Sequence, residues 1–381
     1  MPVASKWTAT LVVSCAAVFT CGPALAGMKV YWGDVHGHTA ISDGKGTVAD
    51  YLTYARDVAK LDFVILTDHD FGNAYPWRMP KEAWQSMQET VDAYTVPGRF
   101  VAIAGYEWTS QAKYWTDVKQ GEETERLFPG PPMQYNHKVI YFPAPVDYLF
   151  SAKDAAYMTP NLLAAAVQAV GGLIDNAHPS ADIEGRDQFD YDPAYSSVIV
   201  NTEIGSDTVF YGGKTYETRT EQVVRGFLNS GGKTGFVKGT DSHEGHPEAR
   251  TGVLATALTR EAIFEALGHR RNYAVSNARI GLSFSINGHP MGEEIEVAGR
   301  PRLAVDVVGT DDVAELAIIR DGAVLTCRRP GVRRASFTFV DARFDGDSYY
   351  YVRVTQVDKD EHGNPSQAWS SPIWVKARKP A

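Results

Sequence analysis

The stretch that decides the fold is residues 29–39, with the sequence KVYWGDVHGHT. It begins as a β-like run over residues 29–32 and leads within a few positions into an H-x-H pair, His36 and His38. Residues i and i+2 of an extended chain point to the same side, so both imidazoles can bind one ion. The stretch therefore predicts metal-binding chemistry at the end of a strand.

Similar β-like runs alternate with amphipathic helical stretches as far as about residue 277. The runs that we expect to be strands are residues 29–32, 63–66, 100–104, 139–142, 172–174, 197–200 and 235–237. The stretches with helical periodicity are residues 48–60, 81–94, 160–170, 217–228 and 260–267. This alternation indicates an α/β fold with a parallel sheet and right-handed crossovers, and seven strands favour a closed or nearly closed (β/α) barrel.

The pattern changes at about residue 278, where strand-like runs follow one another without helices. These runs are residues 280–286, 303–308, 314–319, 335–340, 349–354 and 373–375. Turn signals such as Asn287-Gly288 and Asp321-Gly322 separate them. Short alternating strands of this kind are typical of an antiparallel, Ig-like sandwich. We therefore expect two domains, residues 27–277 and 278–381.

The first 26 residues have the pattern of a cleavable signal peptide. Lys6 precedes an apolar run over residues 8–20, and the segment ends in Ala24-Leu25-Ala26. The apolar run is too short for a stable membrane span. We expect cleavage after Ala26 and a periplasmic or secreted protein. Cleavage would leave Cys327 as the one cysteine, so no intrachain disulfide is expected.

Composition narrows the class of protein further. The chain has 381 residues, of which 44% are hydrophobic and 22% charged, and its formal net charge is −9. These values exclude a disordered or fibrous chain. An acidic chain lacks the broad positive field of nucleic-acid-binding proteins, so we expect no nucleic acid as a partner. The oligomeric state stays open.

Candidate metal ligands follow or precede most of the expected strands of the first domain. Beyond the first pair, they occur in Thr67-Asp68-His69, at Glu107, at His137, in Ala177-His178-Pro179 and in Asp241-Ser242-His243. In a parallel barrel the carboxyl ends of all strands open on one mouth, where active sites lie. Imidazole and carboxylate ligands together favour zinc, manganese or iron over calcium and magnesium. The sequence thus predicts a site for divalent ions.

These motifs, in this order, resemble those of the polymerase and histidinol phosphatase (PHP) superfamily. The resemblance rests on His36-Gly37-His38-Thr39, Ser42-Asp43-Gly44, Thr67-Asp68-His69, Glu107, Ala177-His178-Pro179 and Asp241-Ser242-His243. It covers most of residues 27–277. The stretch from Gly33 to Thr39 and residues 239–280 are similar to a secreted, carbaryl-hydrolase-like branch of the superfamily.

The resemblance implies a distorted seven-stranded barrel with two or three metal ions. It implies that the first ion is held by His36, His38, Glu107 and Asp241. For the second ion it implies Glu107, His137 and His178, and for the third Asp43, His69 and His243. Glu107 would then bridge two ions.

Hydrolysis is the chemistry that such a cluster implies, because clustered cations convert a shared water into a nucleophile near neutral pH. We expect Glu107, Asp241 and His243 to be the catalytic residues. Lys138, Glu203 and His246 are the candidate substrate-binding residues.

A small-molecule phosphoester is the expected substrate. A carboxyl ester, amide or carbamate is the alternative, because the same nucleophile attacks a carbonyl carbon and fold alone does not separate the two. A metal-stabilised, non-catalytic binding protein is the alternative of another class.

Overall fold

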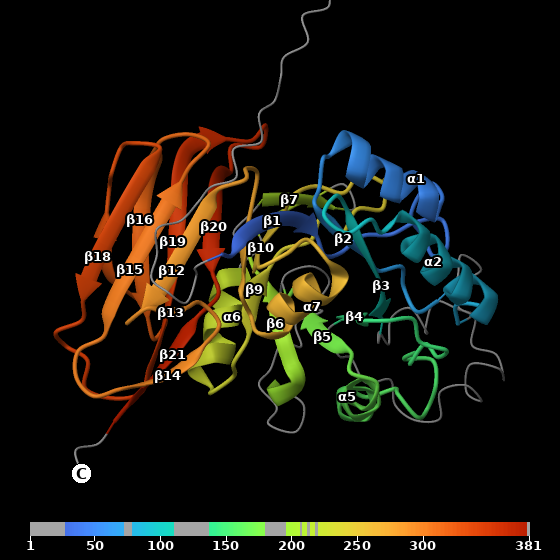
Figure 1. Cartoon of the computed structure of the whole chain (residues 1–381), viewed down its shortest axis with the longest axis horizontal. Coiled ribbons are helices and arrows are strands. Elements are labelled where there is room, and N and C mark those ends of the chain that lie inside the picture. The colour runs from blue at the N-terminus through green and yellow to red at the C-terminus, as the bar shows by residue number, and fades with distance from the viewer. Residues whose placement is uncertain are drawn as a thin grey trace, which may run out of the picture.

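The computed structural model describes residues 27–71, 78–109, 137–179, 196–205, 208–211, 214–217 and 220–378. The expected signal peptide lies outside the described residues. In the described part, a half with helices packed around strands adjoins a half built of strands alone (Figure 1). The mixed α/β architecture is confirmed.

The strands expected in the first half form where the β-like runs lie, with ends shifted by a few residues. They are β1 (Lys29–Asp34), β2 (Phe63–Leu66), β3 (Val101–Trp108), β4 (Lys138–Tyr141), β5 (Leu173–Asn176), β6 (Ile199–Glu203) and β9 (Gly235–Val237). They pair in this order along one sheet. The carboxyl ends of β1, β2 and β3 consequently meet at one edge, as do those of β5, β6 and β9.

The expectation of an all-parallel sheet is wrong at β4, which runs antiparallel to both β3 and β5. Lys138 at the start of β4 pairs with Trp108 at the end of β3. The chain therefore returns to the edge of the sheet that it left. This reversal brings His137, which precedes β4, to the edge where β3 ends.

Two strands that the sequence pattern does not single out, β10 (Thr251–Ala255) and β11 (Asn272–Val275), extend the sheet beyond β1. Backbone pairing among the described residues ends at β9 on the other side. Side chains bridge from β9 toward these strands: Thr251 Oγ1 accepts a hydrogen bond from the Lys238 amide, and Asn272 Nδ2 donates one to Phe236 O. The sheet thus curls toward closure.

The second half contains two sheets in face-to-face packing. Its strands are β12 (Gly281–Ile286), β13 (His289–Pro290), β14 (Glu294–Val297), β15 (Arg302–Val308), β16 (Val313–Arg320), β17 (Ala323–Arg328), β18 (Arg334–Val340), β19 (Ser348–Lys359), β20 (Pro365–Ser370) and β21 (Ile373–Ala377). Strands β13, β12, β15 and β18 form one sheet, and the others belong to the second. A common apolar core lies between the sheets, with members that include Phe284, Val305, Leu316 and Val352.

The two halves share one continuous sheet, because β11 of the first half pairs antiparallel with β20 of the second. A buried polar network adds to this junction. Glu221 accepts hydrogen bonds from Tyr351 Oη, Arg353 Nη1 and Trp369 Nε1. The network anchors the helix that carries Glu221 to the second half.

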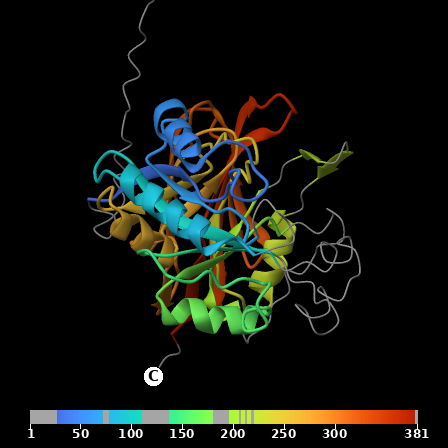
Figure 2. The same cartoon turned by 90° about the vertical axis from the view of Figure 1, so that its right-hand side faces the viewer.

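The helices form in the amphipathic stretches. They are α1 (Val48–Thr53), which continues as a π-helical turn over Tyr54–Val58, α2 (Lys81–Tyr94), α5 (Pro160–Ala169), α6 (Thr220–Asn229) and α7 (Arg260–Gly268). Hydroxyl groups of Thr47 and Thr259 cap α1 and α7. Helix α6 begins later than expected because Lys214–Glu217 forms β8, paired with β7 (Thr208–Tyr211), and this hairpin stands away from the body of the molecule (Figure 2).

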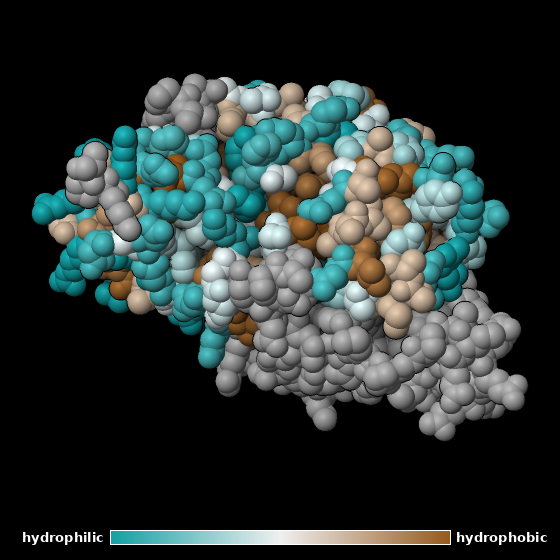
Figure 3. All heavy atoms as spheres, turned by 90° about the horizontal axis from the view of Figure 1, so that it is seen from below, coloured by the Kyte–Doolittle hydropathy of each residue, from teal (hydrophilic) through white to brown (hydrophobic). Residues whose placement is uncertain are grey.

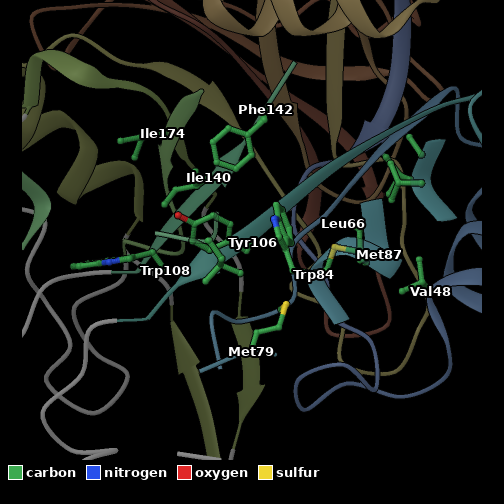
Figure 4. Close-up of a cluster of buried hydrophobic side chains, with 14 of the residues drawn as sticks. Val48, Leu66, Met79, Trp84, Met87, Tyr106, Trp108, Ile140, Phe142 and Ile174 are labelled. Atoms are coloured by element: carbon green, nitrogen blue, oxygen red, sulfur yellow. The ribbon is translucent and has the colours of Figure 1, made fainter. Parts of the chain in front are cut away.

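Side chains of α1, α2 and the neighbouring strands pack into a core on one face of the sheet. Figure 4 shows Trp84, Tyr106 and Phe142 meeting in this core, with Trp108 nearby. Tyr106 and Trp108 flank Glu107 in β3, and neighbouring strand residues point to opposite faces. The apolar core thus fixes the face toward which the Glu107 carboxylate points.

The described exterior has no large helix suited to a bilayer. Within the described ranges, no helix is both long and apolar enough to cross a membrane.

Seen from below, the all-β half at the left presents mostly hydrophilic side chains, whereas hydrophobic ones gather toward the middle and right (Figure 3).

Candidate metal centre

The nine expected ligands come from seven segments of the chain, and the structure brings them together. His36 and His38 follow β1, Asp43 lies in the next loop, and His69 follows β2. The remaining ligands are Glu107 in β3, His137 before β4, His178 after β5, and Asp241 and His243 after β9.

Three groups of these side chains have the geometry to hold an ion, with ligand atoms within 4.8 Å of one another in each group. The groups are His36, His38, Glu107 and Asp241; His38, Asp43, His69 and His243; and His69, Glu107 and His137. The first contains the set implied for the first ion. The second contains the set implied for the third ion, together with His38. The remaining group has His69 where the resemblance implies His178.

Glu107 belongs to two of the three groups and is fully buried. Its Oε1 is 2.6 Å from His137 Nδ1 and 3.0 Å from His178 Nε2. Its Oε2 is 3.0 Å from His69 Nδ1 and 3.3 Å from His36 Nε2. Burial alone would raise the pKa of Glu107, but the surrounding imidazoles hold that pKa well below its usual range. Glu107 is therefore an anion ringed by nitrogen donors.

The buried polar atoms of the centre test whether divalent ions fit there. His36 Nε2, His38 Nδ1, His137 Nε2 and Glu107 Oε2 are buried, and none has a hydrogen-bond partner among the described residues. Buried polar atoms in native proteins nearly always have partners, so such a concentration needs an explanation. Metal coordination supplies one for His36 Nε2 and Glu107 Oε2, which face each other at 3.3 Å. The donor set, imidazole with carboxylate, suits zinc, manganese and iron.

Protonation of two of the histidines, His69 and His243, points in the same direction. Burial would lower the pKa of His69, yet Glu107 and Asp43 raise it to about 10. The pKa of His243 is raised to about 9 against the effect of burial, chiefly by Asp43. Without metal, these imidazoles therefore hold protons where a divalent ion would otherwise balance the carboxylates.

Backbone strain accompanies two of the ligands. The backbone angle φ is 22° at His178 and 51° at Asp241, values that residues other than glycine rarely adopt. The amide of His178 donates to Glu203 Oε2 at 2.6 Å, and the amide of Asp241 donates to His36 O at 3.0 Å. Hydrogen bonds to the neighbouring strand ends thus stabilise a conformation that costs free energy.

Two further buried carboxylates, which are not among the expected ligands, hold the loops of the site. Asp34 accepts hydrogen bonds from the amides of His36 and Thr240 and from Thr240 Oγ1. Asp68 accepts from the amides and hydroxyls of Thr39 and Ser42, on the loop that carries Asp43. Their place inside the ligand motifs was a signal that they serve the site.

The open side of the centre is formed by the ligands that retain solvent exposure. The side chains of Asp43, Asp241 and His243 are 47%, 39% and 39% exposed, and that of His178 is 32% exposed. His36, His38 and Glu107 are at most 1% exposed. Asp43, Asp241, His243 and, to a smaller extent, His178 therefore face solvent.

The three residues expected to bind substrate lie in different environments. Lys138 is 1% exposed within β4, and burial lowers its pKa to about 7. The structure therefore does not place Lys138 on the open side of the centre. Glu203 lies behind His36, 3.1 Å from its Nδ1. His246 is exposed, and its ring centroid lies 4.6 Å from that of Tyr54.

Comparisons with known proteins give one partial match to a family and several relatives. Residues 51–118 match the family DUF3604, described as a protein of unknown function. The chain is 25% identical over 399 residues to an uncharacterized protein of Chlamydia trachomatis, a match that covers 94% of this chain and 60% of the relative. It is 26% identical to an uncharacterized protein of Chlamydia muridarum, covering 90% of this chain and 57% of the relative. The chain thus spans somewhat over half the length of these relatives.

Among solved structures, the chain is similar to a two-domain protein of Bacteroides vulgatus whose description names a predicted PHP-like metal-dependent phosphoesterase. The identity is 14%, the TM-score 0.47, and the match covers 93% of this chain and 97% of the other. A second likeness is to the fibronectin(III)-like modules of Clostridium thermocellum CbhA, at 15% identity and a TM-score of 0.15, covering 25% of this chain and 92% of the other. Neither likeness carries an argument about function.

Proposed function

We propose that this protein is an exported, metal-dependent hydrolase of the PHP superfamily that acts on phosphoesters. The observation that carries the proposal is the environment of Glu107. Its buried carboxylate faces imidazoles from four other segments, and His36 Nε2 and Glu107 Oε2 lie 3.3 Å apart without a hydrogen bond. The motif resemblance to the PHP superfamily supports the same assignment.

The residues of the centre divide into two roles. His36, His38, His69, His137 and Glu107 would hold the ions from the buried side. Bound divalent ions supply an activated water as nucleophile and positive charge against the charge that develops on the substrate. On the open side, Asp43, Asp241 and His243 combine ligand atoms with solvent access, so the substrate would bind there. His243 Nδ1 is 2.9 Å from Asp241 O, a contact that fixes the orientation of its ring.

Phosphoesters are favoured because a cluster of cations suits the displacement of an oxygen at phosphorus. Carbonyl substrates require the same nucleophile, so a substrate panel must separate the two. The purified mature chain, expected to begin at Gly27, would be loaded with Zn²⁺, Mn²⁺ or Fe²⁺ and offered phosphomonoesters, phosphodiesters and carboxyl esters. Intact-mass analysis of exported protein checks the cleavage site.

The expected result is chelator-sensitive turnover of a phosphoester. Turnover of carboxyl esters alone would replace the proposed substrate class and leave the metal centre in place. Tight metal binding without turnover of any ester would favour a metal-stabilised binding protein.

A further inference from the structure

We propose that Glu203 is a positioning residue of the metal centre, which joins three ligand-bearing segments and determines which nitrogen of His36 faces the ions. The inference rests on the proposed metal centre. It gives Glu203 a role other than the substrate contact that the sequence suggests.

The Glu203 carboxylate takes part in three hydrogen bonds. Oε1 is 3.1 Å from His36 Nδ1 and accepts from the Gly239 amide at 3.2 Å. Oε2 accepts from the His178 amide at 2.6 Å. These partners follow β1, β9 and β5, so the last residue of β6 connects three strand ends that carry ligands.

The hydrogen bond to Glu203 determines the tautomer of His36. A carboxylate only accepts hydrogen bonds, so Glu203 requires that His36 Nδ1 carry the proton. His36 Nε2 then has a free lone pair, and it lies 3.3 Å from Glu107 Oε2 and 3.5 Å from Asp241 Oδ1. That nitrogen is buried without a hydrogen-bond partner in the described part of the chain. Metal-binding histidines in general donate their other N–H to a carboxylate or carbonyl.

The backbone of two neighbouring segments is also held close to Glu203. His178 has a positive φ, and the short hydrogen bond from its amide to Glu203 stabilises that conformation. At Gly239, a Cβ atom would lie 2.2 Å from His36 Cβ and 2.7 Å from Glu203 Oε1. Only glycine therefore allows the segment that leads to Asp241 to approach both residues. Through its hydrogen bonds, this one carboxylate thus helps to fix the positions of His36, His178 and the segment that leads to Asp241.

Replacing the carboxylate with an amide of the same size should disturb this arrangement. In Glu203→Gln, the NH₂ group must face an N–H donor on one side or the other. If it faces His36, the proton of that ring moves to Nε2 and blocks the lone pair. If it faces His178, the strained backbone loses its acceptor.

The test uses full-length mature chain loaded with Co²⁺ or Zn²⁺. Metal affinity is measured by competition with a chromophoric chelator, and the visible absorption of the Co²⁺ form reports ligand geometry. For Glu203→Gln we expect affinity for at least one ion about 10- to 100-fold weaker, the range typical when such a partner is removed. The Co²⁺ spectrum should change as well.

Glu221→Gln is the matched control. Glu221 is also a buried carboxylate with three hydrogen-bond donors, but its partners lie at the junction with the second half. This variant should lower the melting temperature and leave the Co²⁺ spectrum and affinity unchanged. A Glu203→Gln protein with the parental spectrum and affinity would overturn the proposal. Equal changes in both variants would also overturn it, because they would indicate general destabilisation.

A second variant covers the case in which Glu203→Gln does not fold. Glu203→Asp keeps the charge but is shorter by one methylene, so it should weaken metal binding less and still change the spectrum. Parental affinity and spectrum in Glu203→Asp would again contradict the role. The outcome is separable from the proposed function: parent protein that binds metal but hydrolyses no ester leaves the role of Glu203 intact.

Discussion

The backbone amide of Phe236, in the short strand β9, donates a hydrogen bond of 2.8 Å to the hydroxyl of Ser371, in the second half of the chain. Ser371 Oγ in turn donates to Asn272 O. In the strand that leads to Asp241 and His243, the backbone N–H at the outer edge therefore finds its acceptor in a residue of the second half. Support for the candidate metal centre crosses the junction between the two halves.

Removing this hydroxyl should destabilise the protein without removing a ligand. Ser371→Ala leaves the buried amide of Phe236 without its acceptor, which should lower the free energy of unfolding by about 1–3 kcal/mol. Ser283→Ala is the control, because the buried hydroxyl of Ser283 has no hydrogen-bond partner among the described residues. Denaturant unfolding should show a loss for Ser371→Ala and little change for Ser283→Ala. Equal losses would contradict the prediction.

Removal of residues 278–381, beyond the proposed domain boundary, should prevent soluble expression. Strand β11 would lose its partner β20, and an unpaired strand edge promotes aggregation. Sedimentation and circular dichroism of the shortened chain test this. A monomeric, folded product would show that the continuous sheet is dispensable.

Glu107→Gln should lose more than one equivalent of metal and nearly all hydrolysis. Glu107 belongs to two of the candidate ligand groups, and without its charge neighbouring cations would repel one another. Asp43→Asn, which affects one group, should lose about one equivalent and keep residual turnover. Elemental analysis of both variants beside the parent provides the measurement. Full metal content in Glu107→Gln would remove the central role of this carboxylate.

Chelation should lower the melting temperature of the parent protein. Ions that bind only the folded chain stabilise it, and without them the buried atoms of His36 and Glu107 have no partner. Glu107→Gln should respond less to the same chelator, because it binds less metal. Calorimetry with and without EDTA tests both statements. An unchanged parental melting temperature would contradict metal binding in the buried centre.

Asp175 should make stability fall as the pH rises. Burial raises its pKa from 3.8 to about 7, although Tyr141 and Asn201 donate hydrogen bonds to it. Between these values the folded state holds a proton that the unfolded state has lost, so the contribution of Asp175 to stability is full below about pH 4 and is lost as the pH rises toward 7. Each unit of difference between the folded-state and unfolded-state pKa corresponds to about 1.4 kcal/mol. In Asp175→Asn, the free energy of unfolding should depend less steeply on pH over this range, and a parental slope would contradict the prediction.

The amino-acid sequence by itself determined the positions of most strands and helices in the first half and named the residues that gather in the candidate metal centre. Strand β2 and helix α2 occupy the expected residues because their hydrophobic periodicity is local. His36, Glu107 and His243 could be predicted as ligands because metal ligands belong to few residue types and these residues lie at or near strand ends. Those properties are readable without knowing which strands are neighbours.

Tertiary structure alone decided the relationships that depend on pairing between distant segments. The reversal of β4, the addition of β10 and β11, and the junction of β11 with β20 follow from strand register, which no local pattern encodes. The burial of Lys138 and the three hydrogen bonds of Glu203 follow from the same pairings. A side chain's chemistry is set by its residue type, but its partners are set by which strand ends the folded sheet brings together.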